Sequence, residues 1–434
     1  MKTQRKDIIV IGFALFAMFF GAGNMIFPPY LGLETGSQWG TGFLSFTFAD
    51  AGLALLTILA MVCGAGSLEG MTHRLGKWSG ILLSTSIFLC VGPLMAIPRT
   101  AASTYELGFE PVFHGGSIFF SILFFAVVFI LTIRPSAVVD IIGKFLTPAL
   151  FIALLVMIGK GIITPVGDVL ATGAQDVFAK GIKAGYQTMD VFGAIIFTVL
   201  VTGTLDKSDY SNKKRIGIVI RAGIVAAVGL SIVYGGLAYL GASATSLYDT
   251  SVTQTQLLVG IVKHLMGSSG IILLGITVAL ACLTTAIGLT SAAAAFFSEM
   301  THGKVPYGAF IGIICVFSCV VSNFGINTII AFSTPILSVV YPATLTLVFL
   351  SFFDKKIKND NVYRFATVGA LIMSVLAVLD SYGVKIAFLK LLPMDKFGFG
   401  WVVPTILCGV IGFMIKPGGK KEIKSTTRAI QSES

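Results

Sequence analysis

Long apolar segments alternate with short polar ones along nearly the whole chain. A transmembrane helix needs about 20 consecutive, mainly apolar residues to cross the hydrocarbon core of a bilayer. Because lipid offers no hydrogen-bond partner to exposed backbone, each such segment is predicted to be a helix. Twelve segments meet this requirement, and they cover residues 8–33, 41–63, 79–98, 117–133, 138–158, 186–204, 216–241, 270–298, 307–323, 328–353, 363–382 and 397–415.

The composition is that of a chain lying mostly in lipid. Of the 434 residues, 55% are hydrophobic and 12% are charged, whereas soluble globular proteins carry about 25% charged residues. A disordered chain would need the opposite balance, with low hydrophobicity and high charge. We therefore expect an all-α integral membrane protein without a soluble domain.

Basic residues lie mainly in the polar connectors, and their distribution predicts the orientation of the chain. The formal net charge is +10, but no basic stripe interleaved with aromatic residues indicates nucleic-acid binding. An even number of spans places both termini on one side. If that side is the cytoplasm, the inner segments hold 22 Lys and Arg residues and the outer ones hold 8, among them Arg99. Because basic residues accumulate on the cytoplasmic side, both termini are expected there.

The first span contains residues that interrupt a helix. The run Gly-Ala-Gly-Asn at residues 21–24, followed by Pro28-Pro29, makes a poor helix interior. In lipid, an interrupted helix is tolerated only where protein or a water-filled cavity satisfies the freed backbone groups. Close packing against another helix through small residues is the alternative explanation.

The sixth span contains a similar segment. Phe-Gly-Ala occurs at residues 20–22 and again at 192–194, and Ile-Phe follows in both places. The second segment lies five spans after the first, and an odd offset inverts the second unit relative to the first. Interrupted helices at matching positions in two halves are typical of transporters with an inverted repeat. The sequence therefore predicts that spans one and six are broken.

Asp190, in the sixth span, is the most informative acidic residue. A charge at mid-membrane costs about 2.5–3.5 kcal/mol on insertion scales, so it must face a partner or water. No Lys or Arg lies inside a central apolar segment. This favours a partner from solution, either a cationic ligand group or a metal ion, over a structural pair with a buried base. Asp50, in the second span, has no glycine break around it and is interpreted as a structural or gating carboxylate.

Hydroxyl groups gather in the eighth span. Thr284 and Thr285 lie one turn from the carbonyl group of Ala281. Neutral oxygens of this kind suit a weakly held Na⁺. Threonine hydroxyls in membrane helices also commonly bond to the preceding turn, which is the alternative explanation.

These segments resemble one known family. The chain is similar over essentially its whole length to the bacterial BrnQ family of branched-chain amino acid transporters, the leucine–isoleucine–valine:cation symporters. The run Gly-Ala-Gly-Asn-Met-Ile-Phe-Pro-Pro at residues 21–29 and the segment Met189–Ile195 carry the resemblance. It implies a LeuT-like fold with a five-plus-five inverted repeat and two additional helices. The implied divisions are a first repeat over 1–158, an extracellular connector over 159–185, a second repeat over 186–353, two further helices within 354–415 and a cytoplasmic tail over 416–434.

The resemblance also implies roles for individual residues. In the wider group, Gly-x-Gly-Asn presents free amides, here those of Ala22 and Gly23, to the substrate carboxylate. The group's Thr-x-Ser is similar to Thr188-x-Asp190, although its distance to Phe-Gly-Ala-Ile is one residue shorter here. By this match, Asp190 replaces a hydroxyl near the substrate ammonium group. The residues implied to bind substrate are Gly21, Ala22, Gly23, Asn24, Thr188, Asp190, Phe192 and Gly193, and those implied to bind Na⁺ are Ala17, Phe20, Ala281, Thr284 and Thr285.

The resulting hypothesis is a sodium-coupled carrier that takes up leucine, isoleucine or valine across the bacterial plasma membrane by alternating access. Proton coupling with the same fold is the alternative. An apolar pocket, for which Phe88 and Phe192 are candidates, separates side chains that differ by one methylene by only about 1–3 kcal/mol. One carrier should therefore accept all three substrates. Apart from Na⁺ as the coupling ion, no cofactor is expected.

Two other classes of protein fit the sequence less well. A membrane-embedded enzyme should carry a metal or nucleophile cluster at membrane depth, but His73, His114, His264 and His302 lie in connectors or at span ends. A channel would more naturally be built from repeated rings of pore-lining residues. Neither an enzyme nor a channel is expected.

Overall fold

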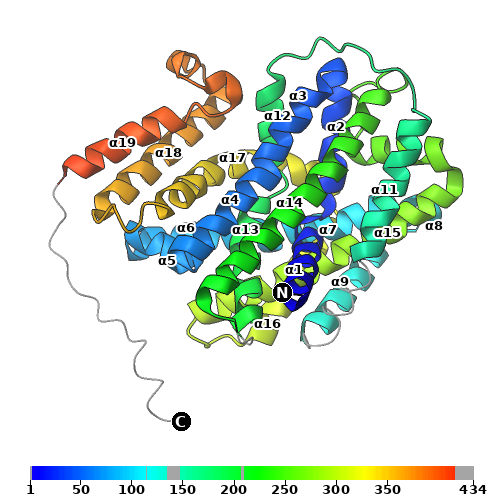
Figure 1. Ribbon diagram of the computed structural model, residues 1–434. Helices are drawn as coiled ribbons and strands as arrows, with labels where there is room; N and C mark the ends of the chain where they lie inside the picture. The colour runs from blue at the N-terminus through cyan, green and yellow to red at the C-terminus, as the bar shows by residue number, and fades with distance from the viewer. Residues whose placement is uncertain (1, 114, 134–146, 207–209, 416–434) are drawn as a thin grey trace.

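The computed structural model describes residues 2–113, 115–133, 147–206 and 210–415, and within these ranges it consists of helices and connecting segments without a β-strand. Figure 1 shows the helices packed side by side in one bundle. The helices before residue 170 are α1 (Lys2–Phe19), α2 (Ala22–Thr35), α3 (Trp39–Thr47), α4 (Leu53–Ala60), α5 (Leu68–Thr72), α6 (Lys77–Leu89), α7 (Ala96–Thr104), α8 (Glu110–Phe113), α9 (Ser117–Ile133) and α11 (Thr147–Ile163).

The second part of the chain adds longer helices. Near the C-terminus, α18 and α19 lie against each other at one edge of the bundle (Figure 1). The helices of this part are α12 (Val177–Tyr186), α13 (Asp190–Asp206), α14 (Asn212–Ser243), α15 (Gln254–Met300), α16 (Tyr307–Ser322), α17 (Ile326–Ser351), α18 (Asp360–Ser381) and α19 (Val402–Met414).

The described helices have the length and surface of membrane spans. Large apolar side chains lie on the outside of the bundle, for example Leu44, Leu82 and Val316, which are 65%, 70% and 68% exposed. Extensive apolar surface of this kind fits contact with lipid. Six helical stretches are long and apolar enough to cross a bilayer, namely Ala22–Gly64, Lys77–Phe113, Lys213–Ser243, Gln254–Met300, Ile326–Ser351 and Asp360–Ser381, and shorter apolar helices cover Ser117–Ile133, Leu150–Ile163, Tyr307–Ser322 and Val402–Met414.

Glycines set the contact between α2 and α14. A Cβ atom built on Gly241 would lie 1.7 Å from the carbonyl oxygen of Pro29, and one built on Gly32 would lie 2.0 Å from that of Ala238. Both distances are far below any contact that a real Cβ atom makes. Small residues allow helix backbones to approach closely in membrane bundles. Direct backbone contact with α14 therefore fixes α2, whose first turn lines the cavity described below.

The third apolar segment, predicted over residues 79–98, belongs to a longer helical stretch. It bends at Gly92, where φ and ψ of −94° and −130° are not helical, and continues as α7. Arg99 therefore lies inside a helix and is 4% exposed, so its assignment to an outer connector is wrong. The reason is that Pro98 lies in the first turn of α7, where backbone N–H groups have no helical acceptor and a proline is tolerated.

The connector predicted over residues 159–185 is partly helical. α11 extends into it, and α12 occupies its last part and packs on α3, where a Cβ atom on Gly181 would lie 1.9 Å from Ser45 Oγ. Three non-helical residues then join α12 to α13. Parts of two further predictions, residues 138–146 of the fifth span and the tail over 416–434, lie outside the described residues.

Candidate functional site

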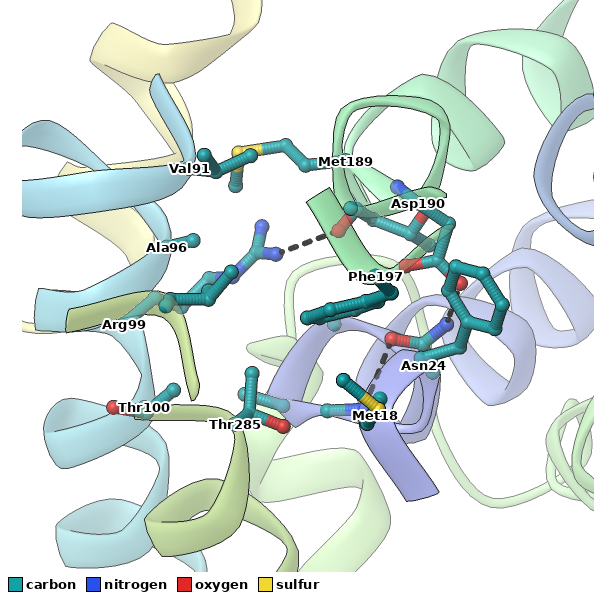
Figure 2. Close-up of a pocket in the computed structure, with 17 residues that line it drawn as sticks. Met18, Asn24, Val91, Ala96, Arg99, Thr100, Met189, Asp190, Phe197 and Thr285 are labelled. Carbon is teal, nitrogen blue, oxygen red and sulfur yellow. Dashed lines mark hydrogen bonds between the residues drawn. The ribbon is translucent and has the colours of Figure 1, made fainter. Parts of the chain in front are cut away.

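Three interrupted helices meet around one cavity inside the bundle (Figure 2). The interruptions lie between α1 and α2, between α6 and α7, and between α12 and α13. The cavity has a volume of about 30 Å³, whereas an apolar protein cavity that binds benzene has about 150 Å³. A larger ligand fits only if lining side chains move. The lining residues are Met18, Phe19, Gly21, Ala22, Gly23, Asn24, Val91, Ala96, Arg99, Thr100, Thr188, Met189, Asp190, Gly193, Phe197, Thr285 and Leu289.

At the first interruption, the backbone leaves the helical path at Gly21. Its φ and ψ of −109° and −164° are extended, and its N–H donates to the Phe19 carbonyl at 2.8 Å and to Asn24 Oδ1 at 3.2 Å. In a continuous helix this N–H would donate to the carbonyl of Ala17, which here loses that donor. α2 then begins at Ala22, and its first N–H groups have no acceptor within the helix. The cavity is thus lined by the N-terminus of a helix.

At the interruption between α12 and α13, the chain makes a tight turn over residues 187–189. Met189 has φ of +67°, in the left-handed region. A non-glycine residue held there costs of the order of 1–3 kcal/mol, and such strain is concentrated at functional sites. The turn aims Asp190, the first residue of α13, into the cavity (Figure 2).

A buried arginine contacts this turn. Arg99 Nη1 donates to the Gln187 carbonyl at 2.6 Å, and Nη2 donates to the Thr188 carbonyl at 3.4 Å. The guanidinium carbon lies 5.6 Å from the ring centre of Phe27, and a Cβ atom on Gly23 would lie 3.0 Å from Nη2. Figure 2 shows the guanidinium group reaching across the cavity from α7 toward the turn. The side chain therefore joins three segments that are distant in sequence.

The position of Arg99 corrects the interpretation of Asp190. That interpretation relied on the absence of a buried base, but Arg99 is buried and lines the same cavity as Asp190. The Arg99 Nε–H has no hydrogen-bond partner among the described residues. Because a guanidinium group has five N–H donors, it can accept a further anionic partner while it keeps its contacts with the turn.

The side-chain amide of Asn24 binds the carboxylate of Asp190. Its Oδ2 accepts from Asn24 Nδ2 at 3.0 Å, and the same amide nitrogen donates to the hydroxyl oxygen of Tyr234 at 2.5 Å. Asn24 Oδ1 accepts the N–H of Gly21, so Asn24 connects the two interruptions directly.

Asp50 lies directly behind this group. It is fully buried, and its Oδ1 accepts from Thr188 Oγ1 at 2.7 Å. It sits in a π-helical turn over Phe48–Gly52, a local widening that is frequent at functional sites. The fold therefore brings Asp50 next to the substrate-binding candidates, although no local sequence pattern places it there.

The residues predicted to bind Na⁺ lie around the first interruption. Thr285 lines the cavity, and its buried Oγ1 has no hydrogen-bond partner in the described part of the chain. This oxygen would lie 3.5 Å from a Cβ atom on Gly21. Thr284 Oγ1 donates to the carbonyl of Ala281 at 2.8 Å, which is the local bond that the alternative explanation expects. Ala17, Phe20 and Ala281 do not line the cavity by their side chains.

Two aromatic candidates for the pocket lie elsewhere. Phe192 is fully buried against Tyr341, with ring centres 4.5 Å apart. Phe88 stacks on Phe296 at 4.0 Å. The aromatic side chain of α13 that lines the cavity is Phe197. The remaining predicted substrate residues all line it.

The third predicted span, which holds the candidate Phe88, does form one wall of the cavity, but sequence reasoning missed the residues of that wall. Val91, Ala96, Arg99 and Thr100 belong to it. Gly92-Pro93, directly beside Val91, was the available signal, because glycine and proline in a membrane span mark a break as they do in the first span.

The cavity offers opposite charges to a ligand. The N-terminus of α2 carries a partial positive charge and free N–H groups, and Arg99 lies beside it. Asp190 offers a negative charge on the α12–α13 side. A small zwitterion is the class of ligand that matches both ends.

Similar proteins are known from sequence. A family model described as "Branched-chain amino acid transport protein" matches residues 4–418. The chain is 37% identical over 426 residues to the branched-chain amino acid permease BraB of Bacillus subtilis (strain 168), covering 94% of this chain and 95% of that protein. It is 36% identical over 430 residues to the branched-chain amino acid permease BrnQ of the same organism, covering 95% of this chain and 98% of that protein.

Solved structures share the fold at low sequence identity. The TM-score is 0.65 at 13% identity with Mhp1, a nucleobase-cation-symport-1 family transporter, over 94% of this chain and 91% of that chain. It is 0.63 at 16% identity with a Na⁺-coupled sialic acid symporter, over 95% and 91%, and 0.53 at 13% identity with MhsT in complex with L-phenylalanine, over 93% and 97%. These likenesses confirm the predicted all-helical, LeuT-like fold class.

Proposed function

We propose, from the premise that this chain belongs to the branched-chain amino acid transport protein family, that it takes up leucine, isoleucine and valine together with Na⁺. The chain is a transporter and not an enzyme, since its relatives are permeases. The observation that carries the proposal is the cavity in which a helix N-terminus and Arg99 face Asp190 (Figure 2). We also propose that the chain is a multi-pass protein of the bacterial plasma membrane and that both of its termini lie in the cytoplasm.

The substrate carboxylate would bind at the N-terminus of α2. The amides of Ala22 and Gly23 are the first of that helix, and Arg99 lies against Gly23. The substrate ammonium group would then bind Asp190. Hydrogen bonds to charged groups contribute about 1.5–3 kcal/mol each, so the two ends of the zwitterion supply most of the affinity and fix its direction.

The branched side chain of the substrate would lie on the apolar part of the wall. This part is lined by Met18, Phe19, Val91, Phe197 and Leu289. Long methionine and aromatic side chains can change rotamer and enlarge the cavity, which is smaller than an amino acid in this structure. One methylene changes binding by only about 1–3 kcal/mol, so the same wall accepts all three branched-chain substrates.

Na⁺ would bind between α1 and α15. Two observations support this position, the Ala17 carbonyl that loses its helical donor and the buried Thr285 Oγ1 without a partner among the described residues. The carbonyls of Phe20 and Ala281 and the hydroxyl of Thr284 would complete the shell, since a hydroxyl that donates to a carbonyl keeps lone pairs for a cation. Na⁺ held there would stabilise the substrate-competent conformation, and coupling requires that difference in affinity between two states.

The same proposal covers the architecture. Twelve spans would form two inverted units of five and two further helices, with spans one and six broken. The helix pairs α1–α2 and α12–α13 correspond to those two spans. Rocking of one unit against the other around a fixed site is the usual consequence of such a repeat.

Uptake of labelled leucine into proteoliposomes tests the proposal. Accumulation should require an inward Na⁺ gradient, and it should stop when K⁺ replaces Na⁺ at fixed pH. Unlabelled isoleucine and valine should compete, and lysine, whose second cationic group the apolar wall cannot accept, should not. Accumulation that persists without Na⁺ and follows a pH gradient would mean that H⁺, and not Na⁺, is the coupling ion. Equilibration without accumulation under any gradient would contradict symport altogether.

A further inference from the structure

Three charged side chains are buried among the described residues, and they meet at one place. Asp50, Arg99 and Asp190 are 0%, 4% and 5% exposed. Arg99 donates to two carbonyls of the α12–α13 turn, Thr188 of that turn donates to Asp50, and Asp190 follows it. If all three are ionised, two acids and one base leave one excess negative charge. An uncompensated buried charge costs several kcal/mol, so the cluster must take up one positive charge.

The hydrogen bonds of Asp50 indicate where this charge resides. Oδ1 accepts from Thr188, whereas the buried Oδ2 has no hydrogen-bond partner in the described ranges. Thr188 links the two acidic residues, because its Oγ1 donates to Asp50 Oδ1 at 2.7 Å and accepts from the backbone N–H of Asp190 at 3.4 Å. Ionised carboxylates only accept hydrogen bonds. A proton on Asp50 Oδ2 makes this oxygen a donor to Asp190 and removes the excess charge at the same time.

A cation from the cavity does not reach Asp50. Asp190 and Thr188 line the cavity, but Asp50 does not. α12 covers it so closely that a Cβ atom on Gly185 would lie 3.2 Å from the backbone nitrogen of Asp50. No group of three or more His, Cys, Asp or Glu residues that could hold a metal ion is brought together among the described residues.

The other titratable groups that face the pair supply no compensating charge beyond Arg99. They are Tyr234 of α14 and Tyr341 of α17. A hydrogen bond donated by the Tyr234 hydroxyl would satisfy Asp50 Oδ2, but it would leave the excess negative charge in place. The charge balance therefore favours a proton on the pair over a rearranged neutral donor.

We propose that Asp50 is protonated and that, as a neutral carboxylic acid, it positions the side chain of Asp190. It keeps its proton through the transport cycle and donates from Oδ2 to the carboxylate of Asp190, which stays ionised and faces the cavity. Asp190 and Arg99 then balance each other, and the cluster is neutral both before and after a zwitterion binds. The consequence for substrate binding rests on the proposed function, whereas the protonation of Asp50 does not.

Substitutions at Asp50 separate a protonated acid from an ionised one. Asparagine has the shape of aspartic acid, and it can donate to Asp190 while its oxygen accepts from Thr188. In leucine uptake by proteoliposomes, Asp50→Asn should stay within about threefold of the wild type, whereas Asp50→Val, which removes the donor, should lower uptake about tenfold, corresponding to about 1.4 kcal/mol.

Three outcomes would overturn this positioning role. Asp50→Asn could lower uptake as strongly as Asp190→Asn, which would mean that Asp50 must be ionised. Asp50→Val could retain wild-type uptake, which would remove any role for the hydrogen bond. Asp50→Asn could exchange leucine but no longer accumulate it against a gradient, which would mean that the proton moves with the substrate.

Infrared spectroscopy tests the protonation without transport. The purified wild-type protein should show the C=O stretching band of a protonated carboxylic acid, Asp50→Asn should lack it, and Glu106→Gln, which removes another partly buried carboxyl group, should retain it. A band that is missing from the wild type or unchanged in Asp50→Asn overturns the inference. A wild-type protein that shows the band but does not accumulate leucine would contradict only the proposed function.

Discussion

The two interruptions joined by Asn24 differ in what they present to the cavity. The α1–α2 interruption presents backbone, namely the free N–H groups at the start of α2 and the carbonyl freed at Ala17. The α12–α13 interruption presents charge, with Asp190 at the cavity, Asp50 behind it and Arg99 bound to the turn. One half of the site therefore consists of backbone groups at a helix N-terminus, and the other consists of buried acidic and basic side chains.

This difference determines how each half can fail. Backbone groups remain in place whichever side chain is substituted, so the first half is damaged only by crowding or by loss of a neighbouring ligand. The second half depends on the balance between the buried charges of Asp190 and Arg99, and removal of either charge leaves the other uncompensated. Substitutions at the second interruption should therefore have larger effects than substitutions at the first.

Loss of Arg99 should have the largest effect. Arg99→Leu leaves Asp190 without its buried counter-charge and the carbonyls of Gln187 and Thr188 without their donor. An uncompensated buried charge costs several kcal/mol, and each buried carbonyl that loses its donor costs about 1–3 kcal/mol more. We expect little monodisperse protein by size-exclusion chromatography in detergent and no leucine uptake.

Arg99→Lys is the matched control for charge. Lysine keeps the positive charge but cannot reproduce the planar fork of donors, so we expect folded protein with reduced uptake. Normal yield and uptake of Arg99→Leu would contradict the charge balance on which the comparison of the two interruptions depends.

Removal of the charge at Asp190 should have the next largest effect. Asp190→Asn keeps a hydrogen-bond acceptor for Asn24 but loses the charge-assisted bond to the substrate ammonium group. That bond contributes about 1.5–3 kcal/mol, so the KM for leucine should rise about 10- to 100-fold at saturating Na⁺. The yield of folded protein should fall less than in Arg99→Leu, because Arg99 keeps its bonds to the carbonyls of Gln187 and Thr188. A wild-type KM in this variant would mean that Asp190 is only structural.

The sequence was sufficient for the features that are local in the chain. Apolar segments of membrane length predict helices because lipid leaves the backbone no other partner, and the family resemblance at residues 21–29 identifies the fold class. The same local patterns pointed to Gly21–Asn24 and Asp190, which line one cavity. Whether these residues bind substrate remains a prediction that transport measurements must test.

The remaining features depend on contacts between distant segments. Thr188 and Asp50 are 138 positions apart, and neither segment alone indicates that they meet. Arg99 directly follows the predicted end of its span at residue 98, so only the path of α7 reveals that its charge is buried. Phe192 and Phe197 occupy the same helix, and their packing rather than their spacing decides that only Phe197 faces the cavity.

At the first interruption, crowding should have a moderate effect. A Cβ atom on Gly23 would lie 3.0 Å from Arg99 Nη2 and 3.1 Å from Phe27 Cε2. Overpacking of this kind costs about 1–3 kcal/mol, and the flexible end of Arg99 keeps it near the lower limit. Gly23→Ala should therefore lower kcat/KM for leucine about fivefold.

The control for Gly23→Ala is a second helical glycine. A Cβ atom on Gly288 of α15 meets no described atom within 4 Å, so Gly288→Ala should transport leucine normally. Equal losses in the two variants would show that the effect comes from helix flexibility, and a tenfold or larger loss in Gly23→Ala with a normal KM would place the crowding outside the substrate site.

The smallest effect is expected from loss of one neutral ligand at the first interruption. Thr285→Ala removes an oxygen that has no hydrogen-bond partner among the described residues, so no internal bond is broken and the folded protein should be unaffected. A neutral contact contributes about 0.5–1.5 kcal/mol, and the half-saturating Na⁺ concentration should rise about two- to tenfold, with the KM for leucine at saturating Na⁺ unchanged. Thr285→Ser should restore the wild-type Na⁺ curve.

Thr290→Ala is the matched control, because its buried Oγ1 lies on the same helix, likewise without a described partner, but outside the cavity. If Thr285→Ala leaves the Na⁺ curve unaltered, the backbone half of the site binds substrate alone, and the coupling ion must act at the charged half.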